Sequence, residues 1–141
     1  MKVLLAIDDS KFSEAATQAV LNQFQPQATE VKVLTVVDLA IPIPTSYAGV
    51  FREESLKHGR ELVQRAGSLL TKAGFKTQTA TEEGDPKSTI IDQAAKWPAE
   101  LIVMGSHGRK GLVHFLTGSV AEGVLRHAPC SVEIVRISNQ K

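Results

Sequence analysis

Three glycines and a serine share one segment of the sequence, at a spacing that suits the binding of a phosphate group. Gly105, Gly108 and Gly118 follow the short apolar run of residues 101–104, and Ser119 comes directly after the last glycine. A continuous apolar run of this kind is typical of a strand that is buried on both faces. Glycine lets the backbone approach a ligand closely, because it has no side chain. The segment therefore predicts a glycine-rich loop at the end of a buried strand.

A helix is expected directly after this loop. Ser119 and Glu122 have the spacing of a capping box, in which a serine side chain caps the first helical turn. A helix N-terminus presents unpaired N–H groups and the positive end of the helix dipole, so it favours an anion. Strand, loop and helix together predict a phosphate site. The alternative interpretation is that the glycines serve only tight turns and that Ser119 only caps its helix.

An acidic pair ends the first apolar stretch. Residues 2–7 predict a buried strand, and Asp8 and Asp9 follow it before Ser10, which is expected to cap a helix. In open parallel sheets, ligands bind at the carboxyl ends of the strands, where the strand order reverses. If the first and fourth strands are neighbours there, Asp8 can accept hydrogen bonds from a ribose while the loop holds the phosphates. The alternative is that an acid only favours the helix start, which we adopt for Asp9 but not for Asp8.

The other segments alternate between strands and helices. Further strands are expected at residues 31–37, 76–81, 101–104 and 132–137, with a helix after each of the first four strands of the chain. Residues 39–49 contain two prolines, so we expect a long irregular loop there, of the kind that serves as a lid or binding segment. The alternation predicts an α/β fold, with one domain over residues 1–141 and a five-stranded parallel sheet covered by helices on both faces.

Composition narrows the classes of function. The 141 residues carry a net charge of +1 with scattered lysines and arginines, so we expect no nucleic-acid partner and no membrane-surface patch. No apolar run is long enough to span a bilayer, and we expect no membrane insertion. Cys130 is the only cysteine, which rules out an internal disulfide and fits a reducing compartment, so a cytoplasmic protein is expected. The four histidines show no metal-ligand spacing, and no metal site made by the protein itself is expected.

Two motifs resemble those of the universal stress protein family. They are the spacing Gly-x2-Gly-x9-Gly-Ser from Gly105 to Ser119 and the sequence Ala-Ile-Asp-Asp-Ser at residues 6–10. The similarity runs the length of the chain and includes residues 35–38, 84–86 and 128–132. The glycine spacing is the one that marks the ATP-binding branch of that family. The resemblance implies an open, Rossmann-like sheet with strand order 3-2-1-4-5, ATP as the ligand, and Mg²⁺ carried by the nucleotide.

The same resemblance assigns roles to individual residues. Asp8 would bond the ribose hydroxyls with the backbone of Ala6 beside it, and Val36 would offer main-chain bonds to adenine. The remaining implied contacts are Met104 and Gly105 at the nucleoside, and Gly108, Arg109, Gly118, Ser119 and Val120 around the phosphates.

Four functions fit these features to different degrees. The first is a regulatory protein that holds ATP with little or no turnover, because no water-activating base stands out beside the expected phosphates. The second is a slow ATP-hydrolysing or nucleotidyl-transferring enzyme with Asp8 or His107 as its base. The third, a phosphoacceptor receiver domain, is disfavoured because the last strand ends in Arg136 and Ile137 without the lysine a receiver needs. The fourth is an interaction protein whose loop holds no ligand.

The last strand predicts a homodimer. Residues 132–137 carry few charges, and at a sheet edge they would leave a row of unpaired backbone groups. A two-fold axis would pair this strand antiparallel with its own copy, with Glu133 and Arg136 facing each other across the axis. Resemblance to the family, whose members commonly dimerise through this strand, implies the same arrangement.

Overall fold

A computed structural model describes residues 1–39, 44–107 and 118–137. All five strands form one sheet in the order β3-β2-β1-β4-β5, and every neighbouring pair is parallel. The strands are β1 (Lys2–Ala6), β2 (Glu30–Val37), β3 (Lys76–Glu83), β4 (Leu101–Gly105) and β5 (Ser131–Val135). The helices are α1 (Lys11–Gln23), a 3-10 turn at Pro26–Ala28, α2 (Thr45–Lys72), α3 (Pro86–Lys96) and α4 (Ser119–His127). The predicted α/β class and strand order are confirmed.

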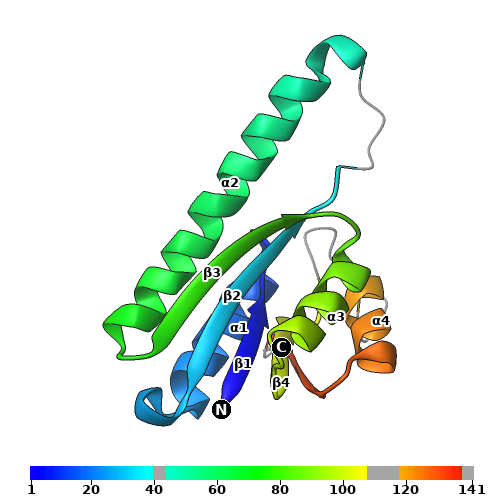
Figure 1. Cartoon of the computed structure of the whole chain (residues 1–141). Coiled ribbons are helices and arrows are strands. Elements are labelled where there is room, and N and C mark those ends of the chain that lie inside the picture. Colours follow the sequence, from blue (N-terminus) through cyan, green and yellow to red (C-terminus); the bar gives the residue numbers. More distant parts are fainter. Residues whose placement is uncertain (40–43, 108–117, 138–141) are drawn as a thin grey trace.

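The helices cover both faces of the sheet, two on each (Figure 1). Alternate residues of a strand point to opposite faces, so each buried strand supplies side chains to two apolar layers. The layer under α1 and α2 includes Val3, Leu5, Val20, Val33, Leu70 and Val103. The layer under α3 and α4 includes Leu4, Ala6, Leu34, Ile90, Ile102, Met104 and Val124. This explains why the inner strands are continuously apolar in sequence.

Helix α2 begins earlier than the sequence predicts. Residues 39–49 were expected to be an irregular loop, but α2 starts at Thr45, with Pro44 as the residue before its first turn. The prediction was wrong for residues 45–49, because Pro44 precedes the helix and therefore does not interrupt it. The early part of α2 extends beyond the sheet, and there Tyr47 and Val50 are exposed (Figure 1).

Two helices begin with side-chain caps, and the one at Ser10 is the cap that the sequence predicts. The Ser10 side chain accepts a hydrogen bond from the backbone N–H of Ser13, at 3.2 Å. At α3, the Asp85 carboxylate accepts one from the backbone N–H of Ser88, at 2.9 Å. The bond to Ser88 lowers the pKa of Asp85, because it stabilises the ionised carboxylate.

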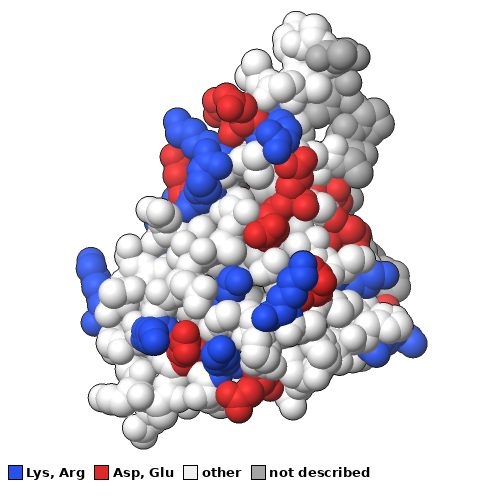
Figure 2. All heavy atoms as spheres, in the orientation of Figure 1, with Lys and Arg blue, Asp and Glu red and all other residues white. Residues whose placement is uncertain are grey.

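Charge is distributed without a large patch of one sign on the face seen in Figure 2. Lysine and arginine side chains are interspersed there with aspartate and glutamate. Within the described residues, no helix combines the length and the apolar character that a membrane span requires.

Candidate functional site

The first and fourth strands are neighbours, and their carboxyl ends meet at the point where the strand order reverses. The chain passes from β1 to β2 on one side, and it later returns to place β4 on the other side of β1. In the register of this pair, Ala6 lies beside Met104 at the last matched position. Asp8 follows one strand and Gly105 ends the other. The structure therefore brings together the two strand ends that carry the predicted chemistry.

Ser106 joins the two ends of the glycine segment, because it follows β4 directly and bonds to Gly118. Its backbone N–H donates to the carbonyl oxygen of Val135, at 2.9 Å, which continues the contact with β5. Its own carbonyl oxygen accepts a 2.6 Å hydrogen bond from the backbone N–H of Gly118. The side chain is buried, and its Oγ lies 3.1 Å from Nδ1 of His107. Ser106 and Gly118, the two ends of the glycine segment, therefore lie together at the end of β4, where α4 begins.

The start of α4 differs from the predicted capping box. Gly118 occupies the capping position, and Ser119 is the first helical residue, with no side-chain cap. The prediction was wrong because the bond from Gly118 to Ser106 starts the helix one residue earlier than the Ser119–Glu122 pattern indicates. Gly118 has φ −76°, a value that any residue adopts, so no left-handed backbone requires glycine there. Within the described residues, the first N–H groups of α4 receive no side-chain cap, and they are suited to an anion.

Four of the predicted site residues pack in one apolar cluster on the α3 and α4 face. Ala6 and Met104 are buried members of this cluster, and Val36 and Val120 are partly buried against it. They come from β1, β4, β2 and α4, respectively. A flat apolar group that enters between these strand ends would meet a surface made of these side chains.

The main chain of Val36 lies beyond the last residue pair of the β1–β2 ladder. The carbonyl oxygen of Leu34 accepts a hydrogen bond from the N–H of Ile7, so Leu34 directs its backbone groups toward β1. Val36, two residues later, directs its own groups the same way. The ladder between β1 and β2 ends at the pair Ala6–Leu34. The backbone of Val36 therefore faces the region past the end of β1.

Asp8 is half-buried and fixed by the start of α1. Its Oδ1 accepts hydrogen bonds from the backbone N–H of Ser10 at 3.0 Å and from the Ser13 hydroxyl at 2.9 Å. Its own N–H donates to Ser13 Oγ at 2.7 Å. The alternative interpretation, support of the helix start, thus describes part of what Asp8 does. Asp9 instead pairs with His58 of α2, with 3.0 Å between Oδ2 and Nε2.

Gly105 is required by the packing of α1. A β-carbon built on it would lie 2.7 Å from the carbonyl oxygen of Phe12, which is too close for any side chain. The Phe12 ring also contacts the ring of His107, with 5.1 Å between centroids. The absence of a side chain at Gly105 brings the first turn of α1 against the end of β4. This packing fixes where Asp8 and the glycine segment lie relative to each other.

Some expected residues cannot be compared with the structure. Gly108, Arg109 and His114 lie outside the described residues. Within the described part of the chain, no three metal-binding side chains come together. Cys130 is half-buried in the α3 and α4 layer, where burial raises the pKa of its thiol and disfavours the reactive thiolate.

Two contacts were missed by the sequence analysis. Ser106 acts mainly through its backbone, so its residue type carried no signal. The Asp9–His58 pair joins residues 49 positions apart, and a histidine on a helix gave no indication of its partner.

The comparisons with known proteins agree on one family. The model of the universal stress protein family matches residues 1–136. Universal stress protein MJ0531 of Methanocaldococcus jannaschii is 33% identical over 96% of this chain and 81% of its own length. The structure of universal stress protein UspA from Lactobacillus plantarum has a TM-score of 0.85 and 26% identity, covering 96% of this chain and 97% of that one. A universal stress protein from Archaeoglobus fulgidus, solved in complex with dAMP, has a TM-score of 0.71 and 22% identity over 96% of this chain and 97% of that one.

Proposed function

The chain belongs to the universal stress protein family, and we propose that it is a regulatory protein that binds ATP with little or no turnover. The observation that carries this proposal is the closed glycine segment between Ser106 and Gly118. Its two ends, Ser106 and Gly118, meet at the end of β4, which is the neighbour of β1, in front of a helix start whose capping residue makes no side-chain hydrogen bond. A neighbour of the same fold is described in complex with dAMP, which supports a nucleotide as the ligand.

We propose that the triphosphate lies against the start of α4. The N–H groups of the first turn would donate to phosphate oxygens, and the helix dipole would favour their negative charge. Gly118, Ser119 and Val120 supply this turn, and Gly108 and Arg109 are proposed as further phosphate contacts. The hydroxyl of Ser119 remains available for the ligand, because it is not used as a cap.

The nucleoside is proposed to lie across the ends of β1, β2 and β4. Ser10 and Ser13 hold Oδ1 of Asp8 in place, so the carboxylate is oriented before a ribose hydroxyl donates to it. The adenine ring would receive main-chain bonds from Val36, beyond the last pair of the β1–β2 ladder. Ala6, Met104 and Gly105 would form the surface beneath the nucleoside.

Mg²⁺ is proposed to arrive with the nucleotide. A magnesium ion keeps several waters and binds phosphate oxygens with few protein ligands, so it needs no three-residue site. When bound, it would neutralise phosphate charge. A hydroxyl such as that of Ser119, directly beside the phosphates, is the kind of oxygen ligand that suits this ion.

Slow turnover of ATP is proposed because Asp8, the acid of the proposed site, already forms hydrogen bonds at the start of α1. Asp8 accepts two hydrogen bonds through Oδ1 at the start of α1, so this carboxylate is held in an orienting role. The glycine segment also has no Gly-Lys-Ser sequence, so the lysine of a P-loop is missing at the start of α4. The test is analysis of the nucleotide released on denaturation of the purified protein, together with phosphate release at saturating ATP. Bound ATP with turnover well below about 1 per second supports the proposal; turnover in the ordinary enzyme range would favour the enzyme alternative.

We propose that the protein is a cytoplasmic homodimer that pairs through β5. Ser106 bonds to Val135, so odd-numbered residues of β5 direct their backbone toward β4, and Val132 and Ile134 direct theirs outward. The expected pairing of Glu133 with Arg136 across the axis does not fit this alternation, since their side chains lie on opposite faces. Glu133 also accepts a 2.6 Å hydrogen bond from Gln23 of α1. The proposed contact therefore depends on backbone pairing and apolar side chains.

A further inference from the structure

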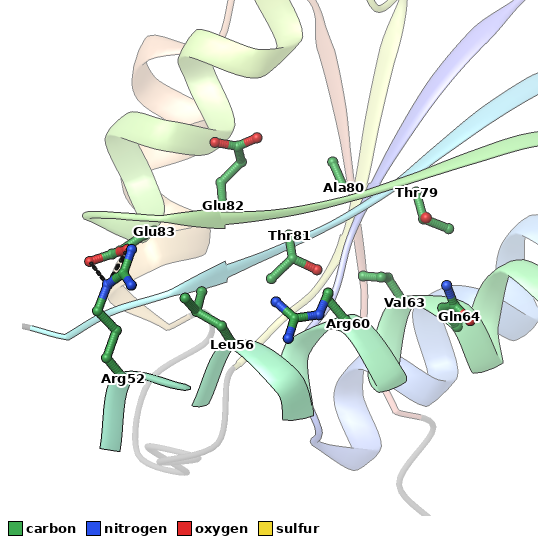
Figure 3. A pocket seen from close by; sticks show the side chains of 10 residues that line it. All are labelled: Arg52, Leu56, Arg60, Val63, Gln64, Thr79, Ala80, Thr81, Glu82 and Glu83. Atoms are coloured by element: carbon green, nitrogen blue, oxygen red, sulfur yellow. Dashed lines mark hydrogen bonds and ion pairs between the residues drawn. The ribbon is translucent and has the colours of Figure 1, made fainter. Parts of the chain in front are cut away.

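A cleft of about 450 Å³ lies between α2 and β3, apart from the ends of β1 and β4. Figure 3 shows its lining, in which Thr79 and Thr81 point toward α2 while Ala80 and Glu82 point to the opposite face of the sheet. Because residues from both faces of β3 line it, the cleft opens onto the outer edge of this strand. From α2 it is lined by Arg52, Leu56, Arg60, Val63 and Gln64.

The edge of β3 presents unpaired backbone groups to this cleft. The N–H of Gly84 donates to the carbonyl oxygen of Val37 at 3.0 Å, so the even-numbered residues of β3 direct their backbone toward β2. The backbone groups of Thr77, Thr79 and Thr81 therefore point away from the sheet. Residues 77–81 are uncharged, so the middle of this edge lacks the charges with which proteins commonly protect exposed strands.

Two polar groups in the cleft lack a protein partner. In the described part of the chain, the Thr81 hydroxyl is buried without a hydrogen-bond partner. Arg52 is paired with Glu83 at 2.8 Å, whereas no carboxylate of the described residues forms an ion pair with Arg60. Figure 3 places Arg60 on the side of α2 that faces Thr81. The buried Thr81 hydroxyl is unfavourable unless a ligand or water satisfies it, whereas Arg60 is exposed and its charge is solvated until a partner binds.

We propose that this cleft binds an extended segment of a partner protein, which adds to β3 as a further strand and places an acidic side chain against Arg60. The outward backbone of Thr77, Thr79 and Thr81 supplies the main-chain hydrogen bonds of strand addition. Arg60 supplies charge selectivity, because a carboxylate can accept two parallel hydrogen bonds from a guanidinium. Leu56 and Val63 contact the apolar side chains of the incoming segment, and Thr81 gains a hydrogen-bond partner.

Selection from a library of nonapeptides, random except for a central Glu, Gln or Lys, tests charge selectivity on the full-length protein. The wild type is expected to retain Glu peptides at least about ten-fold better than Gln or Lys peptides. Arg60→Gln should abolish this preference, and Arg65→Gln, which removes an exposed charge of α2 outside the cleft, should preserve it. No preference in the wild type, or an unchanged preference in Arg60→Gln, would overturn the proposal.

Thr79→Pro tests strand addition separately. Its N–H points outward, so proline removes an edge donor and no ladder bond of the β2–β3 pair. The variant should keep its thermal unfolding within a few degrees of the wild type, bind ATP as the wild type does, and lose the selected peptides. Retention of the peptides by the folded variant would contradict strand addition. A change in sedimentation of the peptide-free protein would assign this edge to a second copy of the chain instead. Because ATP affinity is measured in parallel, failure here is distinct from failure of the proposed nucleotide site.

Discussion

The backbone N–H of Gly118 donates a 2.6 Å hydrogen bond to the carbonyl oxygen of Ser106, twelve positions earlier in the chain. This bond closes the glycine segment at the end of β4, the strand beside β1, and sets the first turn of α4 there. Neither residue needs a side chain to make it. The geometry of the proposed phosphate site is therefore defined by main-chain atoms, and substitutions that add bulk there should affect binding more than those that remove a functional group.

Gly118→Val is expected to weaken ATP binding by at least about ten-fold while the protein stays folded. The backbone at Gly118 has φ −76°, which valine adopts, so the effect comes from a branched side chain placed where the backbone approaches phosphate. Calorimetric titration measures the affinity, and thermal unfolding checks the fold. Gly49→Val is the matched control, because a β-carbon at Gly49 meets nothing within 4 Å. Equal affinity in the two variants would remove Gly118 from the binding site.

Asp8→Ala should weaken ATP binding more than Asp9→Ala. The substitution removes the carboxylate proposed for the ribose, and hydrogen bonds to charged groups contribute roughly 1.5–3 kcal/mol. It also deprives Ser10 and Ser13 of their acceptor, so a lower melting temperature is expected. Asp8→Asn should be milder, since its amide keeps an acceptor oxygen. Asp9→Ala removes only a neighbouring carboxylate paired with His58. If both alanine variants bound ATP alike, the ribose role of Asp8 would be wrong.

Gly105→Ala is expected to destabilise the protein by roughly 1–3 kcal/mol, the usual cost of overpacking. The new methyl group would lie 2.7 Å from the carbonyl oxygen of Phe12, so the first turn of α1 must move away from β4. Chemical denaturation measures the free energy of unfolding. Gly49→Ala, in an open position of α2, should leave it unchanged or raise it slightly. Equal unfolding free energies of Gly105→Ala and wild type would show that α1 does not pack closely against Gly105.

Sequence patterns located the inner strands because buried parallel strands are continuous apolar runs, and the resemblance to the universal stress protein family implied their order. They also made Asp8 and the glycine segment candidates for the site, and the structure places the strand ends that carry them side by side. Sequence patterns failed to give the first residue of two helices, because backbone geometry determines where those helices begin. Pro44 looked like part of a loop but precedes the first turn of α2, and the bond from Gly118 to Ser106 moved the helix start away from Ser119. The cleft beside β3 was also missed. In the sequence, Arg52 and Arg60 are typical of a solvent-exposed helix face, and only the structure shows that they lie beside the edge of β3.

Ile134→Pro is expected to convert the proposed homodimer into a monomer. The N–H of Ile134 points away from β4, so proline removes a donor from the free edge and leaves the β4–β5 ladder intact. Sedimentation at micromolar concentration distinguishes the two states. Glu133→Gln, which keeps a polar side chain beside Gln23, serves as the control and should remain dimeric. A wild-type monomer, or a dimer that the proline leaves unchanged, would contradict pairing through β5.

Calorimetric titration of the wild-type protein with MgATP tests whether ATP binds where the closed glycine segment meets the ends of β1 and β4. The protein must first be freed of any nucleotide that it retains on purification. We expect one site per chain, weaker binding when EDTA removes the magnesium, and a further loss of affinity in Gly118→Val. No heat of binding from nucleotide-free, folded wild-type protein, or full affinity retained by Gly118→Val, would contradict binding at this site.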